Sequence, residues 1–290
     1  MAMRVLVFGA NGQLGSALMR LYPDQVFGLL RADVDLTSRN AVHSKVIELR
    51  PDAIINSAAF TDVDGAENDL ETAMAVNGDA VATIAAVAGA SDIPLVHVST
   101  DYVFDGSGPS PHRPEDPTAP LNAYGLSKRA GEQAIAQTSV RAAILRTSWV
   151  FSETGKNFAK TMLRLGETHD SLRVIDDQVG GPTPANDLAH ATMALARGLT
   201  AHSIAPDIYH FSGSPDVSWA DFAQAIFLES NQKVEIERVS TAAYGQKIAQ
   251  RPLNSRLDCA SFTKATGLER PDWRLALKEL VAQWEKGDVV

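Results

Sequence analysis

Apolar positions in the first half of the chain occur as short continuous runs separated by segments with helical spacing. Residues 4–10, RVLVFGA, form the first run and lead through a glycine-rich turn into a segment with Leu14, Leu18 and Leu21 at intervals of three or four. A continuous apolar run followed by an amphipathic segment predicts a strand, a turn and a helix. Four more runs of the same kind lie at 25–30, 52–58, 95–100 and 141–148.

Segments with helical patterns connect these runs. A helix is expected at 38–50, with Ser38 at its start and Pro51 after its end. The alanine-rich segment 71–92 predicts one long or twice-started helix, and a further helix is expected to begin near Asn122. Strands joined by helices of this length indicate a parallel sheet, and continuous apolar strands are typical of a sheet covered on both faces. We therefore expect an α/β fold with a doubly wound parallel sheet of the Rossmann type.

The alternation loosens in the second half of the chain. Helices with one apolar face are expected at 157–167, 219–230 and 273–284, while 171–198 predicts a short strand, a Gly/Pro-rich turn and another helix. The run at 207–213 is expected to be one more core strand. These elements predict a smaller C-terminal lobe over the ends of the sheet strands.

The predicted elements divide the chain into two expected domains. Residues 1–148 plus about 180–212 form the sheet domain, and residues about 149–179 plus 213–290 form the smaller lobe. No repeat or low-complexity segment is visible in the sequence.

Composition and charge exclude some classes of partner. The chain has 290 residues, is 45% hydrophobic and carries a formal net charge of −9, so it has enough apolar residues for a large core but no basic footprint for nucleic acid or anionic lipid. No secretory signal is visible, and the most apolar stretch, AVATIAAVAGA, is 11 residues long, too short for a membrane span. The single cysteine, Cys259, cannot form an internal disulfide and is expected to be a packing residue. We expect a cytoplasmic protein that binds neither nucleic acid nor membrane.

A glycine triplet lies between the first predicted strand and helix. Gly9, Gly12 and Gly15 would allow a tight turn, a close approach of the backbone to a pyrophosphate and close packing of the helix on the sheet. The free amides of the helix N-terminus would then face the phosphates. A βα turn that is tight for structural reasons alone is the alternative. We expect a dinucleotide to contact Gly9, Asn11, Gly12, Gln13, Leu14 and Gly15.

The second strand is expected to end where an adenosine ribose would lie. Arg31 suits the 2′-phosphate of NADPH, whereas Asp33 or Asp35 would suit the free hydroxyl of NADH. We favour NADPH and leave NADH open. The remaining predicted cofactor contacts are Arg31, Asp35, Leu36, Ala58, Ala59, Tyr124 and Lys128.

Polar residues collect at the ends of three predicted strands, in NSAAFTDV from 56, HVSTDYVF from 97 and AYGLSK from 123. Because ligands of open α/β sheets bind at the carboxyl ends of the strands, these stretches are expected to meet in one crevice. Tyr124 and Lys128 are one helical turn apart, so we expect the ammonium to lower the pKa of the phenol. A surface pair without function is the alternative.

Thr100 together with Tyr124 and Lys128 is the pattern of the extended short-chain dehydrogenase/reductases. Within that superfamily, STDYVFDG, NAYGLSK, LRTSWVF and GKNFAKTML closely resemble the dTDP-4-dehydrorhamnose reductases, and VIDDQVGGPT and RPLNSRLD extend the resemblance to near the C-terminus. The resemblance implies that NAD(P)H delivers hydride to the C4 carbonyl of dTDP-4-dehydro-L-rhamnose, giving dTDP-L-rhamnose for cell-surface polysaccharides. It also implies that the smaller lobe binds the sugar nucleotide.

The same resemblance implies roles for single residues. Tyr124 would supply the proton, Lys128 would stabilise the phenolate and bind the nicotinamide ribose, and Thr100 would hydrogen-bond the carbonyl oxygen. Thr61 and Trp149 would line the sugar pocket, although a buried core role for Trp149 is the alternative. Further substrate contacts are expected at Thr100, Asp101, Tyr102, Arg251 and Asn254.

Tyr102 separates this chain from some relatives. Sugar-nucleotide 4,6-dehydratases carry Thr-Asp-Glu where this chain has Thr100, Asp101 and Tyr102, so net reduction is favoured over dehydration. A 4-epimerase shares the Tyr/Lys pair and is excluded only by the longer strings. A non-catalytic NADP-binding regulatory subunit of the same fold is the rival from another class.

Residues elsewhere in the chain give further expectations about ligands, metals and oligomeric state. Arg251 and Arg256 would suit a diphosphate, with surface salt bridges as the alternative. Some members of the family dimerise through magnesium held by glutamates, and the corresponding positions here are taken to be Ala17 and Asn186, with Asp187 one residue away. We therefore expect no metal site, no interface magnesium, and a monomer or weak homodimer. The histidines His97, His190 and His210 are expected to be structural.

Overall fold

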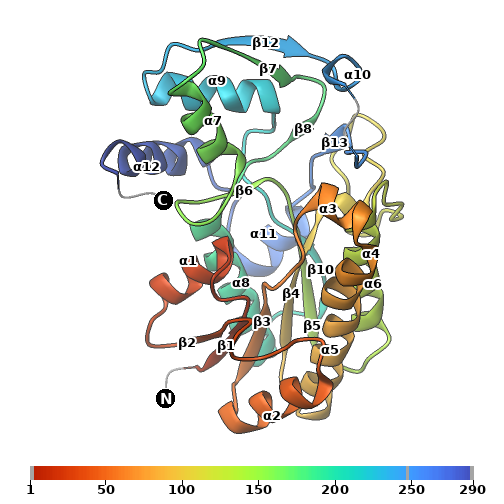
Figure 1. Ribbon diagram of the computed structural model, residues 1–290. Helices are drawn as coiled ribbons and strands as arrows, with labels where there is room; N and C mark the ends of the chain where they lie inside the picture. The colour runs from red at the N-terminus through yellow and green to blue at the C-terminus, as the bar shows by residue number, and fades with distance from the viewer. Residues whose placement is uncertain (1–2, 246–247, 288–290) are drawn as a thin grey trace.

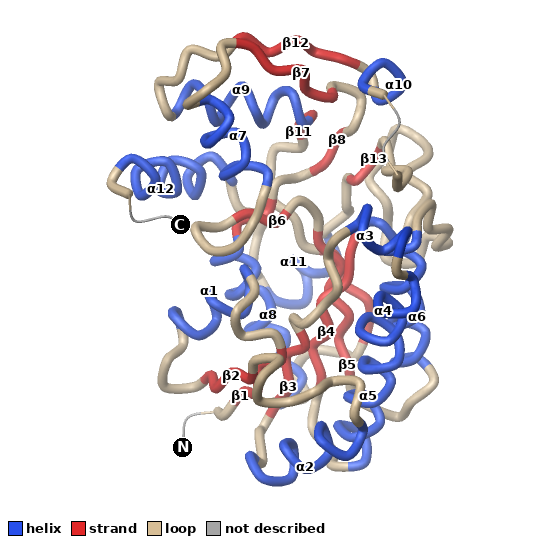
Figure 2. The backbone as a smooth tube through the Cα atoms, viewed as in Figure 1, coloured by secondary structure: helices blue, strands red, loops and turns tan. Residues whose placement is uncertain are grey.

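Six parallel strands form the main sheet of the molecule (Figures 1 and 2). The computed structural model describes residues 3–245 and 248–287. The strand order is β10-β5-β4-β3-β1-β2, and each neighbouring pair is parallel. The predicted doubly wound parallel sheet is therefore confirmed. The strands are β1 (Val5–Phe8), β2 (Val26–Leu29), β3 (Ala53–Asn56), β4 (Leu95–Thr100), β5 (Ala142–Thr147) and β10 (Asp207–His210).

The continuous apolar runs became the central strands because both faces of the sheet are covered. Every residue of β1, β3 and β5 is buried. The chain passes from β1 to β2 on one side and returns to β3 on the other, so the strand order reverses between β1 and β3. A crevice at the carboxyl ends of the strands is expected at such a reversal.

Helices cover the sheet in two layers. On one face, α1 and α8 pack against each other and contribute to a cluster with β1, β3 and β5; on the other face, α2 and α5 pack on β1, β3 and β4, with α6 beside them (Figure 1). The helices of the two layers are α1 (Gln13–Leu21), α8 (Ala185–Thr200) and α11 (Ala260–Thr266), and α2 (Arg39–Leu49), α3 (Val63–Asn68), α4 (Leu70–Met74), α5 (Ala80–Ala90) and α6 (Ala123–Ala136).

The alanine-rich helix is interrupted by one turn of π-helix, Ala75–Asp79, between α4 and α5. Asn77 in this turn binds the loop after β3, because its Oδ1 accepts the amide of Phe60 at 2.8 Å and its Nδ2 donates to the Phe60 carbonyl at 2.9 Å. Its Nδ2 also lies 2.9 Å from the Ser127 hydroxyl of α6. The π-turn therefore joins the loop after β3 to α6.

The same helical run corrects the expectation that no apolar stretch of the chain is long enough for a membrane span. Leu70–Ala90 spans 21 residues, and its most apolar 18-residue window has a mean hydropathy of 1.4, so it is long and apolar enough by length and composition to cross a membrane. Within the described residues, half of its most apolar window is buried, and α5 packs against α2 and α6. We interpret it as a core helix of the α/β layer.

The second region lies beyond the carboxyl ends of the sheet, at the top of Figure 1, and has its own apolar core. Its helices are α7 (Phe158–Gly166), α9 (Trp219–Glu229), α10 (Thr241–Tyr244) and α12 (Trp273–Glu285), and its short strands are β6 (Val150–Phe151), β7 (Ser171–Ile175), β8 (Val179–Gly180), β9 (Thr183–Pro184), β11 (Val217–Ser218), β12 (Glu235–Val239) and β13 (Asn254–Ser255). The division of the chain into two domains at the stated residues stays a prediction.

Candidate active site

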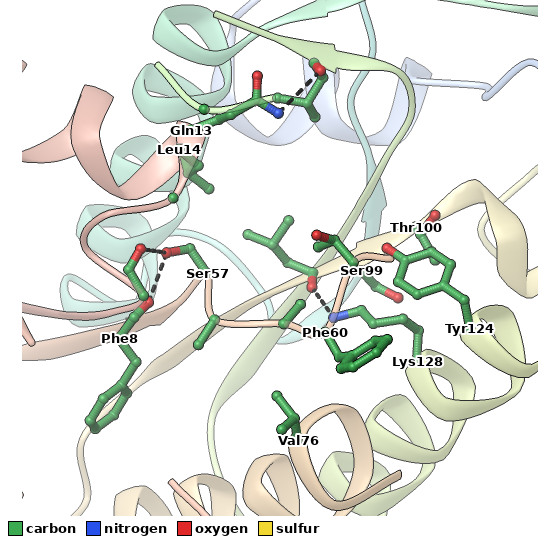
Figure 3. Close-up of a pocket in the computed structure, with 18 of the residues that line it drawn as sticks. Phe8, Gln13, Leu14, Ser57, Phe60, Val76, Ser99, Thr100, Tyr124 and Lys128 are labelled. Atoms are coloured by element: carbon green, nitrogen blue, oxygen red, sulfur yellow. Dashed lines mark hydrogen bonds between the residues drawn. The ribbon is translucent and has the colours of Figure 1, made fainter. Parts of the chain in front are cut away.

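A pocket of about 840 Å³ lies at the carboxyl ends of the sheet strands, where the strand order reverses. Its walls come from the loop after β1, the ends of β2 to β5, α6 and the first residue of α9, among other segments. Figure 3 shows part of this lining, with Gln13 and Leu14 of α1, Ser99 and Thr100 of β4, and Tyr124 and Lys128 of α6 labelled. Most of the residues predicted from the sequence line it: Gly9, Asn11, Gly12, Gln13, Leu14, Arg31, Asp35, Leu36, Ala58, Ala59, Thr61, Thr100, Asp101, Tyr102, Tyr124, Lys128 and Trp149.

The glycine loop has the shape expected for close approach of a phosphate group. Gly9 has φ +82°, and a Cβ placed on it would lie 2.6 Å from the amide nitrogen of Ala58. Gly12 begins α1 without a side-chain cap, so no side chain of the described chain accepts its first-turn amides as a cap would. Uncapped amides at a helix N-terminus that lines a pocket are suited to an anion. The loop therefore fits the pyrophosphate of a dinucleotide.

Gly15 differs from the other two glycines of the triplet. It does not line the pocket, and a Cβ placed on it would lie 2.2 Å from the carbonyl oxygen of Gly9 and 2.6 Å from Cα of Ala10. Its direct contact with the cofactor stays a prediction, and the observed close approach shows that glycine at this position lets α1 pack closely against the loop.

Gln13 connects the glycine loop to the second region. Its Oε1 accepts hydrogen bonds from Ser152 Oγ at 3.1 Å and Asn157 Nδ2 at 3.0 Å, and its Nε2 lies 3.4 Å from the Val150 carbonyl. Asn157 in turn caps α7 through the amide of Lys160. The first turn of α1 is thus tied to the segment that starts the second region.

Arg31 and Asp35 both line the pocket and lie in the loop after β2. Two hydrogen bonds from Thr37 hold the pKa of the Asp35 carboxyl below its usual range, and the Arg31 charge acts in the same direction. Asp33 instead accepts the Leu30 amide at 2.8 Å and does not line the pocket. A cation and a carboxylate therefore both lie where the adenosine ribose of a dinucleotide would bind.

Tyr124 and Lys128 lie on α6, whose start is fixed by Asn122. The Asn122 side chain accepts the Gly125 amide at 2.8 Å, so the helix begins at Ala123 and places Tyr124 in its first turn. Lys128 is 2% exposed, and its Nζ donates to the Val98 carbonyl at 2.7 Å (Figure 3). Figure 3 shows Thr100, Tyr124 and Lys128 together on one side of the pocket.

The predicted pKa of Tyr124 was wrong in direction. Burial raises the pKa of the Tyr124 phenol, and this effect exceeds the lowering by its hydrogen bond with Thr100. Burial also lowers the pKa of Lys128 to about 8. Helical spacing predicted the closeness of the two groups correctly, but it carried no information on how little water reaches them.

Asp101 and Tyr102 follow β4 directly. Asp101 is 2% exposed, and burial raises its pKa to about 7 even though its Oδ1 accepts the Thr100 hydroxyl at 3.0 Å. Its Oδ2 finds no hydrogen-bond partner among residues 3–245 and 248–287. The Tyr102 ring lies edge-on to Tyr124 with centroids 5.7 Å apart. A carboxyl group that is partly protonated near neutral pH therefore lies beside the Tyr124 phenol.

The indole of Trp149 stacks on Trp219, a residue that the sequence did not indicate. The ring centroids are 3.5 Å apart and the planes differ by 11°, and both rings line the pocket. Gly180 leaves room for this arrangement, because a Cβ there would lie 2.8 Å from the Trp149 ring. Trp219 was only one apolar position of a predicted amphipathic helix, and no local signal marks its contact with a residue 70 positions earlier.

Arg251, Arg256 and Asn254 do not line the pocket, and their expected contacts with the nucleotide or sugar stay predictions. Arg251 pairs with Asp64, with Nη2 to Oδ2 at 2.8 Å and Nη1 to Oδ1 at 3.1 Å. Asn254 donates to the carbonyls of Gly108 and Ser110 and accepts Nε of Arg256 at 2.8 Å. These side chains hold loops together near the site.

The remaining sequence expectations concern single residues away from the pocket. His97 and His210 are buried, and His190 bonds the Tyr22 hydroxyl at 2.6 Å. Cys259 is buried beside Val103, Phe104 and Leu257.

The two positions taken for metal-binding glutamates differ in exposure. Ala17 is buried in the cluster that α1 and α8 share, whereas Asn186 is partly exposed and accepts a hydrogen bond from Arg20 at 2.5 Å. In the described part of the chain, no group of three His, Cys, Asp or Glu is placed to hold a metal. The absence of magnesium stays a prediction.

Comparison with known proteins gives one consistent result. Residues 3–286 match the family model described as RmlD substrate binding domain. The chain is 42% identical over 287 residues to a dTDP-4-dehydrorhamnose reductase of Sinorhizobium fredii, covering 96% of this chain and 97% of that protein, and 40% identical over 283 residues to the spore coat polysaccharide biosynthesis protein SpsK of Bacillus subtilis, covering 97% of each. It also resembles the crystal structure of a dTDP-4-dehydrorhamnose reductase of Bacillus anthracis in complex with NADP, with a TM-score of 0.91, 35% identity and coverage of 98% and 100%.

Proposed function

The chain belongs to the family of the RmlD substrate binding domain, whose curated members include dTDP-4-dehydrorhamnose reductases, and from that premise we propose its reaction. The protein is an NAD(P)H-dependent oxidoreductase that reduces the C4 ketone of dTDP-4-dehydro-L-rhamnose to dTDP-L-rhamnose, a precursor of cell-surface polysaccharide. The observation that carries the proposal is that Thr100, Tyr124 and Lys128 share one pocket with the glycine loop.

Tyr124 is the proton donor in this proposal. Its raised pKa supports the role, because the phenol stays protonated at neutral pH and is ready to give its proton to the oxygen that becomes negative during reduction. Thr100 hydrogen-bonds the same oxygen and lowers the pKa of the phenol. The Lys128 ammonium stabilises the phenolate that remains after proton transfer.

The cofactor proposed for the pocket is NADPH, with NADH as an alternative. When bound, the reduced nicotinamide supplies the hydride that adds to C4 of the sugar. The glycine loop, from Gly9 to Leu14, holds the pyrophosphate at the uncapped start of α1, and Lys128 binds the nicotinamide ribose. Arg31 in the lining of the pocket supports the choice of NADPH, as does the NADP bound by the Bacillus anthracis protein.

The substrate is proposed to lie between Tyr124 and the second region. Thr61, Asp101 and Tyr102 contact the hexose, and the Trp149 indole packs on it, with Trp219 supporting that ring from its other face. The lobe formed by residues about 149–179 plus 213–290 provides the sugar-nucleotide side. We further propose that the protein acts in the cytoplasm as a monomer or weak homodimer without bound magnesium.

The test is oxidation of NADPH, followed by its absorbance, with dTDP-4-dehydro-L-rhamnose as substrate. We expect turnover by the native chain, and Tyr124→Phe should lower kcat by roughly 10²- to 10⁴-fold, because general acid catalysis is lost, with NADPH affinity nearly unchanged. A native chain that binds NADPH but does not oxidise it with this substrate would instead be a regulatory subunit. An equally active Tyr124→Phe protein would remove Tyr124 from the acid role.

A further inference from the structure

Two buried polar side chains, Asn56 and His97, lie behind Lys128 and have no role in the steps proposed for Tyr124. Asn56 at the end of β3, His97 in β4 and Lys128 on α6 are 1%, 0% and 2% exposed. His97 Nδ1 lies 3.1 Å from Asn56 Nδ2, and His97 Nε2 lies 3.4 Å from Lys128 Nζ. The imidazole therefore connects an amide to the proposed catalytic lysine.

The orientation of the Asn56 amide is fixed by the backbone. Its Oδ1 accepts the amide of Ala58 at 3.2 Å, so its Nδ2 is the atom that faces the ring of His97. An amide NH₂ only donates hydrogen bonds, so it requires a lone pair on His97 Nδ1. The ring proton of a neutral His97 then lies on Nε2 and points toward Lys128.

His97 stays neutral in this environment. Burial, and secondly the charge of Lys128, lower its pKa well below the usual range. An ammonium has no lone pair and cannot accept the Nε2–H of His97, whereas a neutral amine can. The charged Lys128 bonds the Val98 carbonyl at 2.7 Å instead, on the side that lines the pocket.

We propose that His97, held in its Nε2–H form by Asn56, is a positioning residue that turns the Lys128 ammonium toward Val98 and the pocket and disfavours the ammonium relative to the amine. The contribution of this pair to turnover rests on the proposed function. The tautomer itself is a property of the free protein.

The other ionisable groups around Lys128 leave the His97 imidazole with an important influence on the charge of Lys128. Glu132, one turn further along α6, favours the ammonium, but both of its oxygens are bound by the buried Arg146 at 2.9 and 2.7 Å. Tyr124 and Asp101 line the same pocket. Burial keeps the Tyr124 phenol protonated and raises the pKa of Asp101 to about 7, so the Asp101 carboxyl is partly protonated near neutral pH. Lys128 itself has a pKa of about 8. A modest change in its contact with His97 therefore changes the fraction of Lys128 that is charged near neutral pH.

The direct test is a long-range ¹H–¹⁵N correlation spectrum of the full chain with ¹⁵N-labelled histidine, without cofactor or substrate. The sequence contains seven histidines, and His97→Gln identifies the signal of interest. We expect His97 to carry its proton on Nε2 and to remain neutral from pH 6 to pH 9. A proton on Nδ1, or an imidazolium in this range, would overturn the proposal, whether or not the chain is a reductase.

Asn56→Asp tests the link to Lys128. A carboxylate accepts the ring proton, so the proton should move to Nδ1, and the freed Nε2 lone pair should accept a hydrogen bond from the ammonium. The alkaline limb of kcat/KM for NADPH oxidation should then shift upward by about one pH unit, since stabilising the charged lysine raises its pKa. A proton on Nδ1 with an unshifted limb would show that the ring does not disfavour the ammonium.

Asn77→Asp is the matched control for introducing a buried carboxylate. Asn77 is also fully buried, but its amide bonds Phe60 and Ser127 rather than the ring of His97. The His97 proton should stay on Nε2 in this variant. If it moved to Nδ1 here too, the tautomer would not be set by Asn56, and the proposal would fail.

Discussion

The glycine wall of the pocket, residues 9–14, is made by one continuous strand–turn–helix segment, whereas the side-chain wall, Asp101, Tyr102, Tyr124, Trp149 and Trp219, takes residues from segments far apart in the sequence. The glycine wall has its shape from backbone geometry, such as the positive φ of Gly9. The side-chain wall has its properties from burial, which raises the pKa of Asp101 and Tyr124. Shape is therefore a local property here, and protonation is a property of the assembled fold.

The largest expected effect that tests the difference between the two walls concerns Asp101 in the side-chain wall. Burial raises its pKa from 3.8 to about 7. Between these two pH values the folded protein keeps the Asp101 proton, whereas the unfolded chain has lost it. The stability from this proton is fully present below pH 4 and is lost as the pH rises through about 7. Between pH 4 and pH 7.5 the native protein should lose, relative to Asp101→Asn, on the order of 4 kcal/mol in the free energy of unfolding, measured with urea.

Asp105→Asn is the control for that measurement. Asp105 is exposed, and hydrogen bonds from Ser107 lower its pKa. The native protein should therefore lose no stability relative to Asp105→Asn as the pH rises from 4 to 7.5. Native and Asp101→Asn stabilities that run parallel across the range would show that the carboxyl is ionised throughout. The side-chain wall would then not differ from the glycine wall in this respect.

Gly15→Ala and Gly12→Ala should separate folding from binding within the glycine segment. A Cβ at Gly15 meets the Gly9 carbonyl at 2.2 Å, so this variant should lose about 1–3 kcal/mol in the free energy of unfolding from overpacking. A Cβ at Gly12 meets only that carbonyl, at 3.4 Å, so this variant should stay folded and bind NADPH more weakly. Chemical unfolding and a fluorescence titration with NADPH measure the two effects. Equal stability of both variants would contradict the packing role of Gly15.

The smallest expected effect is at Trp219. An aromatic pair contributes about 0.5–1.5 kcal/mol beyond the area that it buries, so Trp219→Leu should raise KM for the sugar nucleotide by roughly 2- to 12-fold and leave NADPH affinity unchanged. Trp284→Leu is the control, because Trp284 lies on α12, bonds Glu167 and does not line the pocket. A change in NADPH affinity without a change in KM would assign the indole pair to the cofactor.

Local pattern predicted the sheet and the glycine segment well for a physical reason. Buried strands must be apolar, and the turn after β1 needs glycine at Gly9, which has φ +82°, so both constraints appear in short continuous stretches of the sequence. The β12 strand, Glu235–Val239, was missed because most of its residues are exposed and it lies at the outer side of the second region. Family membership followed from long strings and is confirmed by the family model.

The side-chain wall was predicted less completely, because its properties depend on long-range contacts. Arg251 was expected near a diphosphate, and no local pattern indicated its ion pair with Asp64, 187 positions earlier. Trp219 carried no signal apart from its place on an amphipathic helix. His97 was expected to be structural, and only its distance from Lys128 connects it with the chemistry.

The π-turn at Ala75–Asp79 sets the rotational phase of the helix that follows it. A π-turn accommodates an extra residue without breaking the helix. Because the extra residue is absorbed within this turn, deleting it would restore α-helical spacing and leave Val81, Ile84 and Ala85 of α5 facing the sheet. A one-residue deletion in this turn is therefore expected to be better tolerated than the same deletion inside α5, where every later residue of the helix would rotate by about 100°.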